Sequence, residues 1–87
     1  MVKGTITVKN ESGLHMRPAS ELAKTAGKLR SEITILAGNK EINPQSVLDL
    51  MSAGIRKGMT IEIICEGESE EADLQAMLDA IAGGLGE

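Results

Sequence analysis

Gly13-Leu14-His15-Met16-Arg17-Pro18-Ala19-Ser20 is the stretch that organises the rest of this sequence. Proline has a preset φ and no backbone donor, so Pro18 suits the first turn of a helix, where its amide would have no intrahelical partner. After it, apolar residues recur at the spacing of one buried helical face: Ala19, Leu22, Ala23 and Ala26. The pattern predicts a helix over Met16–Gly27 that begins directly after the only histidine of the chain and stops at Gly27.

The start of this predicted helix brings three chemical features together. A helix N-terminus presents unpaired amide N–H groups and the positive end of the helix dipole, which favour a nearby anion and disfavour a protonated imidazole. His15 is therefore expected to be available as a nucleophile, and Arg17 supplies a permanent charge that matches phosphate oxygens. These are the requirements of phosphoryl transfer. A histidine at a helix start is also commonly a plain surface residue or a cap, so the local pattern leaves both interpretations open.

Two stretches carry a family resemblance. Residues 13–19 read Gly-Leu-His-x-Arg-Pro-Ala, which resembles the active-site signature of HPr, the family of histidine-containing phosphocarriers of the bacterial sugar phosphotransferase system. Residues 45–55 resemble the second signature of that family, around a serine that a regulatory kinase phosphorylates in Gram-positive bacteria. The two stretches stand in the order and at the separation typical of the family, in a chain of its usual size.

The resemblance implies a phosphoryl carrier rather than an enzyme with independent turnover. Phospho-enzyme I, charged from phosphoenolpyruvate, would place a phosphoryl group on Nδ1 of His15, and a sugar-specific enzyme IIA domain would remove it. Arg17 would stabilise the phosphoryl group. The hydroxyl or amide of Ser12 is a further candidate contact, although Ser12 also suits an ordinary loop or cap. Neither a cofactor nor a metal is implied.

Ser46 and the residues after it form a second candidate site. Ser46 followed three residues later by Asp49 is typical of a capping box and predicts a short helix that begins there, with Asn43-Pro44 as the alternative start. By resemblance, HPr kinase/phosphorylase would phosphorylate Ser46, and a catabolite-control regulator would then bind. This helix has too many apolar residues for one buried face, so we expect Leu50 to pack inward. The expected docking residues for enzyme I and the enzyme IIA domains are Val47, Leu48 and Met51.

The composition argues against several classes of function. The 87 residues are 41% hydrophobic with a net charge of -4, and none is aromatic. Without a basic tract or an aromatic to stack on bases, nucleic-acid binding is not expected. The single cysteine, Cys65, excludes an internal disulfide and a zinc site and is expected to be buried in a strand. No apolar run approaches ~18 residues and no signal-peptide pattern opens the chain, so we expect a cytoplasmic protein without membrane insertion. The length predicts a single domain over residues 1–87, which we expect to be monomeric.

The order of predicted elements indicates an α+β fold. Alternating polarity, or a hairpin signal at Gly38-Asn39, predicts strands over residues 2–9, 31–36, 40–42 and 60–66. An acidic run that includes Glu68, Glu70 and Glu71 suits the start of a last helix that ends at Gly83-Gly84. The order βαββαβα indicates a four-stranded sheet covered by three helices on one face. The resemblance adds an antiparallel, HPr-like open-faced β-sandwich with the short second helix near the histidine.

Three other functions fit parts of the sequence. An HPr paralogue of the nitrogen or dihydroxyacetone phosphotransfer branch keeps the chemistry, although the pattern Ser-x-x-x-x-Met-Ser-x-Gly-Ile favours the sugar branch. A split-βαβ RNA-binding module is opposed by the acidic balance and the missing aromatics. A small acyl-phosphate hydrolase that uses Arg17 and an asparagine would turn over by itself and leave His15 dispensable.

Overall fold

Seven elements follow one another in the computed structural model, which describes residues 1–87. They are β1 (Val2–Thr7), α1 (Met16–Gly27), β2 (Glu32–Ala37), β3 (Lys40–Ile42), α2 (Val47–Ser52), β4 (Thr60–Glu66) and α3 (Glu70–Ala82). The βαββαβα order predicted from the sequence is confirmed.

The four strands form one sheet in the order β1-β4-β2-β3, and every neighbouring pair is antiparallel. β4 lies between β1 and β2, and pairs with β2 in the register Ile35↔Ile63. Its inward residues Ile61, Ile63 and Cys65 are buried, as their alternate spacing predicts. A turn at Gly38-Asn39 joins β2 to β3, at the position where the hairpin signal predicts it.

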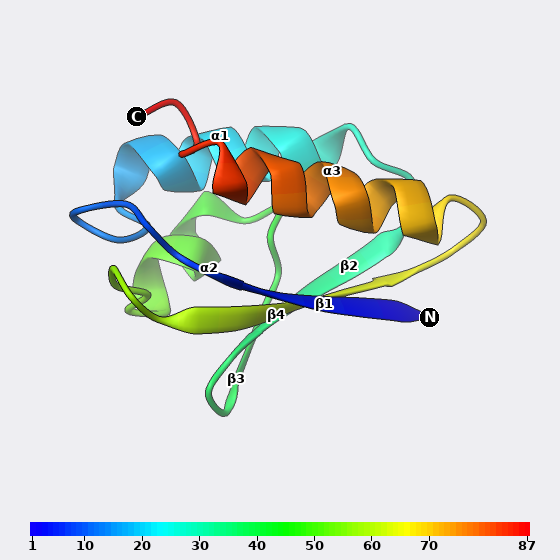
Figure 1. The fold of residues 1–87 in the computed structure, drawn as a ribbon, viewed down its shortest axis with the longest axis horizontal. Helices are drawn as coiled ribbons and strands as arrows, with labels where there is room; N and C mark the ends of the chain where they lie inside the picture. Colours follow the sequence, from blue (N-terminus) through cyan, green and yellow to red (C-terminus); the bar gives the residue numbers. More distant parts are fainter.

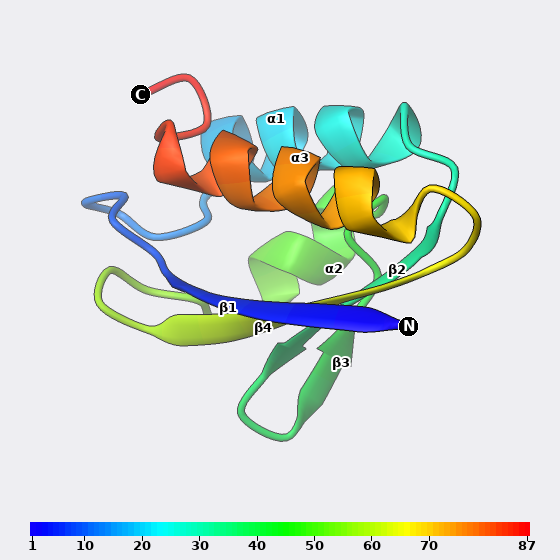
Figure 2. The same cartoon turned by 45° about the vertical axis from the view of Figure 1, so that its right-hand side comes forward.

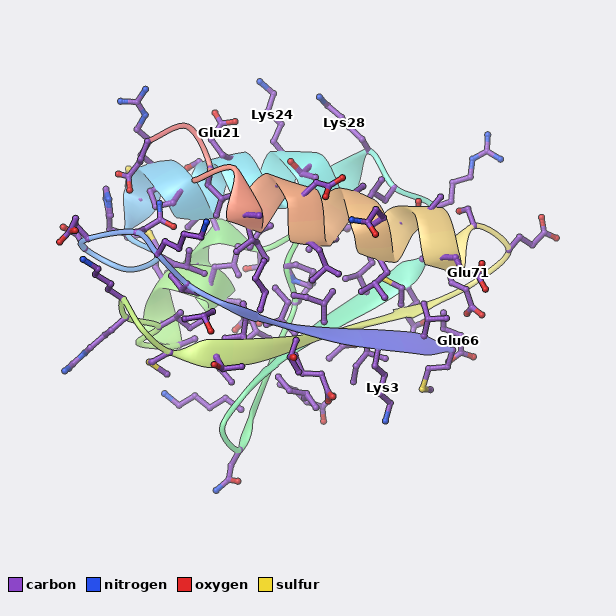
Figure 3. The ribbon with its side chains drawn as sticks, in the orientation of Figure 1. Lys3, Glu21, Lys24, Lys28, Glu66 and Glu71 are labelled. Carbon is purple, nitrogen blue, oxygen red and sulfur yellow. The ribbon has the colours of Figure 1, made fainter.

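All three helices lie on one face of the sheet, as Figure 1 and Figure 2 show. α3 packs over β1 and β4, and α1 lies beside α3 and against α2. Figure 3 shows Glu21 and Lys24 projecting from the outer surface of α1, with Lys28 directly after its end, whereas Lys3 points from β1 toward the face that no helix covers. The architecture is therefore the open-faced β-sandwich that the family resemblance implies.

The core lies between the sheet and the helices and contains no aromatic side chain. It is one cluster of 17 buried apolar residues. Fully buried members come from every layer: Leu22 of α1, Ile35 of β2, Leu50 of α2 and Met77 of α3. Removal of this apolar surface from water holds all three helices on the sheet. The expectation that Leu50 packs inward is confirmed.

Several predicted boundaries differ by one or two residues. β1 ends at Thr7 rather than at residue 9, because Val8 pairs with the loop before β4: its amide donates to the Met59 carbonyl at 2.8 Å. β2 begins at Glu32 rather than at residue 31, because the amide of Ser31 donates to a side chain of α3. α1 does end at Gly27, but without a left-handed glycine.

The buried carboxylate of Asp73 links the start of α3 to the start of β2 through hydrogen bonds. Asp73 accepts hydrogen bonds from the Ser31 hydroxyl at 2.6 Å, from the Ser31 amide at 2.9 Å and from the Ser69 hydroxyl at 2.8 Å. The Ser31 hydroxyl, and after it the other donors, lower the pKa of Asp73 against the opposing effect of burial. Glu70 and Glu71 share this first turn, so the prediction that acidic residues open the last helix is confirmed.

Candidate functional site

The loop between β1 and α1 is held against the loop after α2. Gly13 adopts a φ of +67°, and the next amide, that of Leu14, donates to the Ile55 carbonyl at 3.1 Å. A Cβ atom on residue 13 would overlap the Ile55 carbonyl oxygen and lie 2.9 Å from Cα of Arg56. Only glycine therefore fits. The contact fixes the backbone directly before His15.

His15 is the N-cap residue of α1. Its backbone is extended, with φ -76° and ψ -170°, and its carbonyl accepts the first helical hydrogen bond from the amide of Ala19 at 2.9 Å. Its ring does not cap the helix, and the amides of Met16 and Arg17 make no hydrogen bond within the chain. The imidazole is 42% exposed. An accessible ring therefore stands beside two free amide donors, the arrangement that the sequence pattern predicts.

The side chain of Glu87 contacts the imidazole, a contact that the sequence reasoning missed. Its Oε2 lies 2.7 Å from Nε2 of His15, and its Oε1 accepts from Nδ2 of Asn10 at 2.7 Å. The pKa of Glu87 is lowered, first by the Asn10 hydrogen bond and then, against partial burial, by His15 and the charge of Arg17. Nδ1 is the ring nitrogen that has no partner within the chain.

The segment after α3 brings Glu87 to this position. The Leu85 amide donates to the Ala80 carbonyl at 3.3 Å and the Gly84 amide to the Ile81 carbonyl at 3.1 Å, the two hydrogen bonds of a Schellman motif. Leu85 is 4% exposed and belongs to the core. The predicted stop at Gly83-Gly84 is confirmed, and the motif turns the chain back toward the start of α1.

Arg17 and Ser12 lie near the residues that hold the imidazole. No carboxylate oxygen lies within salt-bridge distance of the Arg17 guanidinium. A Cβ atom on Gly86 would lie 3.9 Å from Nε of Arg17, so its charge is beside the segment that carries Glu87. The Ser12 hydroxyl makes no hydrogen bond within the chain. Ser12 lines a cleft together with Lys9, Asn10, Glu11, Gly84 and Glu87.

Ser46 is the N-cap of α2, as predicted. Its Oγ accepts from the amide of Asp49 at 3.1 Å. The second half of the predicted capping box is different: the Asp49 carboxylate accepts from the amide of Asn43 at 2.8 Å, because the Ser46 amide already donates to the Asn43 carbonyl. The side chain of Gln45 reaches the Ala26 carbonyl at 3.5 Å. Ser46 therefore lies near the C-terminal end of α1, away from the histidine.

The three docking candidates on α2 differ in exposure. Leu48 is 75% exposed and Met51 is 40% exposed, whereas Val47 is half-buried and packs against the core. Met16, which follows the histidine, is 64% exposed and adds a further apolar side chain. Exposed large apolar side chains are candidates for partner binding. The accessible side chains of the candidate surface are those of Met16, Leu48 and Met51.

Neither a metal cluster nor a membrane-spanning helix is found in the structure. No group of three or more His, Cys, Asp or Glu side chains is placed to hold a metal ion. None of the helices combines the length and the apolar character needed to cross a membrane. Cys65 is free and buried in β4, as predicted.

The fold and the site define a class: a small open-faced β-sandwich with one accessible histidine at the start of its first helix. The family described as "PTS HPr component phosphorylation site" matches residues 2–83. The chain belongs to this family, the HPr phosphocarrier proteins of the phosphotransferase system, which are carriers rather than catalytic enzymes.

Individual relatives agree with this assignment. Phosphocarrier protein HPr of Mycoplasma capricolum is 39% identical over 77 residues, which cover 88% of this chain and 86% of that protein. A crystal structure of HPr from Thermoanaerobacter tengcongensis superposes with a TM-score of 0.93 at 38% identity and covers 100% of this chain and 98% of its own. The multiphosphoryl transfer protein of Salmonella typhimurium is 39% identical over 90 residues. The chain spans only 24% of that longer protein.

Proposed function

We propose that this protein accepts a phosphoryl group from phospho-enzyme I on Nδ1 of His15 and passes it to sugar-specific enzyme IIA domains. The observation that carries the proposal is the imidazole itself: it is accessible, stands at the start of α1, and is held through Nε2 by Glu87 at 2.7 Å. Membership in a family of phosphotransferase-system carriers supports the same role.

The Glu87 contact favours Nδ1 as the nucleophile. A carboxylate accepts hydrogen bonds and does not donate them, so Nε2 carries the ring proton and donates the hydrogen bond to Glu87. In the neutral ring the lone pair is then on Nδ1. In the reaction, the lone pair of Nδ1 forms the new bond to phosphorus while the bond between phosphorus and phospho-enzyme I breaks.

Donors around the ring supply charge stabilisation for the bound phosphoryl group. The amides of Met16 and Arg17 have no partner in the chain, and the Arg17 guanidinium is free of carboxylates. A dianionic phosphoryl group on Nδ1 would complement these donors and the positive end of α1. Ser12 would add its free hydroxyl.

Docking uses the exposed apolar side chains beside the site. Enzyme I and the enzyme IIA domains would bind in turn over Met16, Leu48 and Met51, with Val47 contributing its accessible part. Each complex must dissociate between two transfers, so the interface should be small. The protein would act as a monomeric single domain in the cytoplasm, without a cofactor or metal of its own.

Ser46 would regulate docking rather than chemistry. It lies at the start of α2, and a phosphate there would be stabilised by the helix start without unfolding the helix. HPr kinase/phosphorylase would add the phosphate, and its charge beside Leu48 would oppose an acidic partner surface. The phosphorylated form would bind a catabolite-control regulator instead.

The test is phosphorylation with purified enzyme I and labelled phosphoenolpyruvate. We expect an acid-labile, base-stable label on the wild-type protein, the same label on Ser46→Ala, and none on His15→Ala. Folding of His15→Ala would be checked by far-UV circular dichroism. A wild-type protein that takes no label, or a folded His15→Ala protein that takes it equally, would overturn the proposal. Enzyme I of the nitrogen branch, run in parallel, would show a faster reaction if the alternative pathway were correct.

A further inference from the structure

Methionine is over-represented among the large apolar side chains that this protein exposes. Those side chains are Met1, Met16, Leu48 and Met51, and the two most relevant, Met16 and Met51, are 64% and 40% exposed. Unlike leucine, an exposed methionine can be oxidised at sulfur under physiological conditions. The composition of this surface therefore makes it chemically modifiable.

Met16 and Met51 lie at the same end of the molecule. Met16 is the first residue of α1, and Met51 is in the last turn of α2. The Leu14 amide, just before α1, donates to the Ile55 carbonyl, just after α2, which brings the two helix ends together. Figure 1 shows α2 packed beneath α1 on this side.

The remaining methionines differ in ways that make oxidation selective. Met77 is fully buried in the core. Met59 is half-buried, and its sulfur accepts a hydrogen bond from the amide of Arg56 at 3.2 Å. Met1 is exposed, but Figure 1 places the N-terminus at the opposite end of the sheet. Of the three exposed sulfurs, two therefore belong to the candidate docking surface.

We propose that Met16 and Met51 are modification sites whose reversible oxidation to methionine sulfoxide by peroxides switches off partner docking. The inference rests on the proposed carrier function. In each step the sulfur lone pair attacks one peroxide oxygen, a new S–O bond forms and the O–O bond breaks. The proton on the attacked oxygen passes to the departing hydroxide, which leaves as water, so sulfur loses two electrons and the peroxide gains them.

The modification replaces a flexible apolar group with a polar one at the docking surface. A sulfoxide oxygen strongly attracts water, which would have to be removed when a partner binds. The imidazole, Arg17 and the free amides are left unchanged, so docking is affected and the chemistry is not. Methionine sulfoxide reductase would restore the sulfur and with it the activity.

The experiment measures phosphoryl acceptance by His15 from phospho-enzyme I before and after treatment of the whole protein with hydrogen peroxide. Peptide mass spectrometry should find sulfoxide at Met16 and Met51, and none at Met77. The second-order rate constant should fall by about tenfold or more, the loss expected when a buried methionine contact is removed from an interface. Treatment with the reductases MsrA and MsrB should restore it.

The Met16→Leu/Met51→Leu double variant is the matched control, because leucine has a similar volume and cannot be oxidised. Its rate constant for phosphorylation before treatment serves as its own reference. Peroxide should leave that rate constant unchanged, although Met1 is still oxidised. A wild-type protein that carries both sulfoxides and reacts as fast as before overturns the inference while leaving the proposed function intact. If untreated protein is not phosphorylated at all, the proposed function fails and the inference fails with it.

Discussion

Replacement of Gly13 by alanine tests whether the contact between the Gly13 loop and the loop after α2 determines the position of His15. A residue with a Cβ atom at the left-handed φ of +67° costs about 1–2 kcal/mol. The new atom would overlap the Ile55 carbonyl oxygen, which adds an overpacking cost of about 1–3 kcal/mol. Displacing that carbonyl also weakens its 3.1 Å hydrogen bond from Leu14, worth about 0.5–1.5 kcal/mol. We therefore expect Gly13→Ala to lose about 2.5–6.5 kcal/mol of unfolding free energy.

Gly38→Ala is the matched control. Gly38 has nearly the same φ, +61°, but a Cβ atom there would meet nothing within 4 Å, so only the conformational cost of about 1–2 kcal/mol applies. Because the chain has no aromatic residue, unfolding in urea is followed by far-UV circular dichroism. Phosphorylation of His15 should slow in Gly13→Ala and not in Gly38→Ala. Equal losses of stability in the two variants would mean that the Ile55 carbonyl does not restrict the residue at position 13.

Further predictions concern the cap, the core, the buried carboxylate and the regulatory serine. Ser46→Ala should lose about 1 kcal/mol in urea unfolding because the Asp49 amide loses its acceptor, and an unchanged midpoint would contradict this. Leu50→Ala should lose about 2–5 kcal/mol, whereas Leu48→Ala, at an exposed position, should change stability by less than about 0.5 kcal/mol. The pKa of Asp73 is lower in the folded protein than in the unfolded chain, where it is about 3.9. The Asp73 carboxylate therefore stabilises the fold at pH values above about 3.9, and this stabilisation is lost as the pH falls through the pKa of the folded protein. Asp73→Asn should therefore flatten the decline of unfolding free energy below about pH 5, and an unaltered acid slope in urea titrations would count against it. Ser46→Asp should accept phosphate from enzyme I several-fold more slowly than Ser46→Asn, which has the same size without the charge, and equal rates would remove the regulatory proposal.

The elements and their order were predictable because local patterns determine them. Alternation marks the buried face of β4, and the spacing of Ala19, Leu22 and Ala26 marks that of α1. Pro18 in the first turn places the helix start beside His15 without any knowledge of the fold. The predicted end of β1 and the predicted start of β2 are wrong for the same reason. At Val8 and Ser31 the backbone bonds to a distant segment that no local pattern reveals.

The contacts that complete the site could not be predicted because they join distant parts of the chain. Glu87 and His15 are 72 positions apart, and their contact depends on how the Schellman motif after α3 redirects the last residues. The sequence indicates only that Asn10 is a turn residue, yet its side-chain amide donates hydrogen bonds to both the Gly84 carbonyl and the Glu87 carboxylate. A weak signal existed for Met16: it precedes the apolar stripe of α1, so its exposure follows from its place at the first helical position.

The proposed carrier function requires the phosphoryl group to be bonded to Nδ1 of His15 while Nε2 keeps its hydrogen bond with Glu87. The chain has a single histidine, so labelling that residue with ¹⁵N gives only two ring nitrogens to assign by NMR. After reaction with phosphoenolpyruvate and enzyme I, we predict that phosphorus couples to Nδ1. Coupling to Nε2, or a spectrum identical to that of the unreacted protein, would contradict the account.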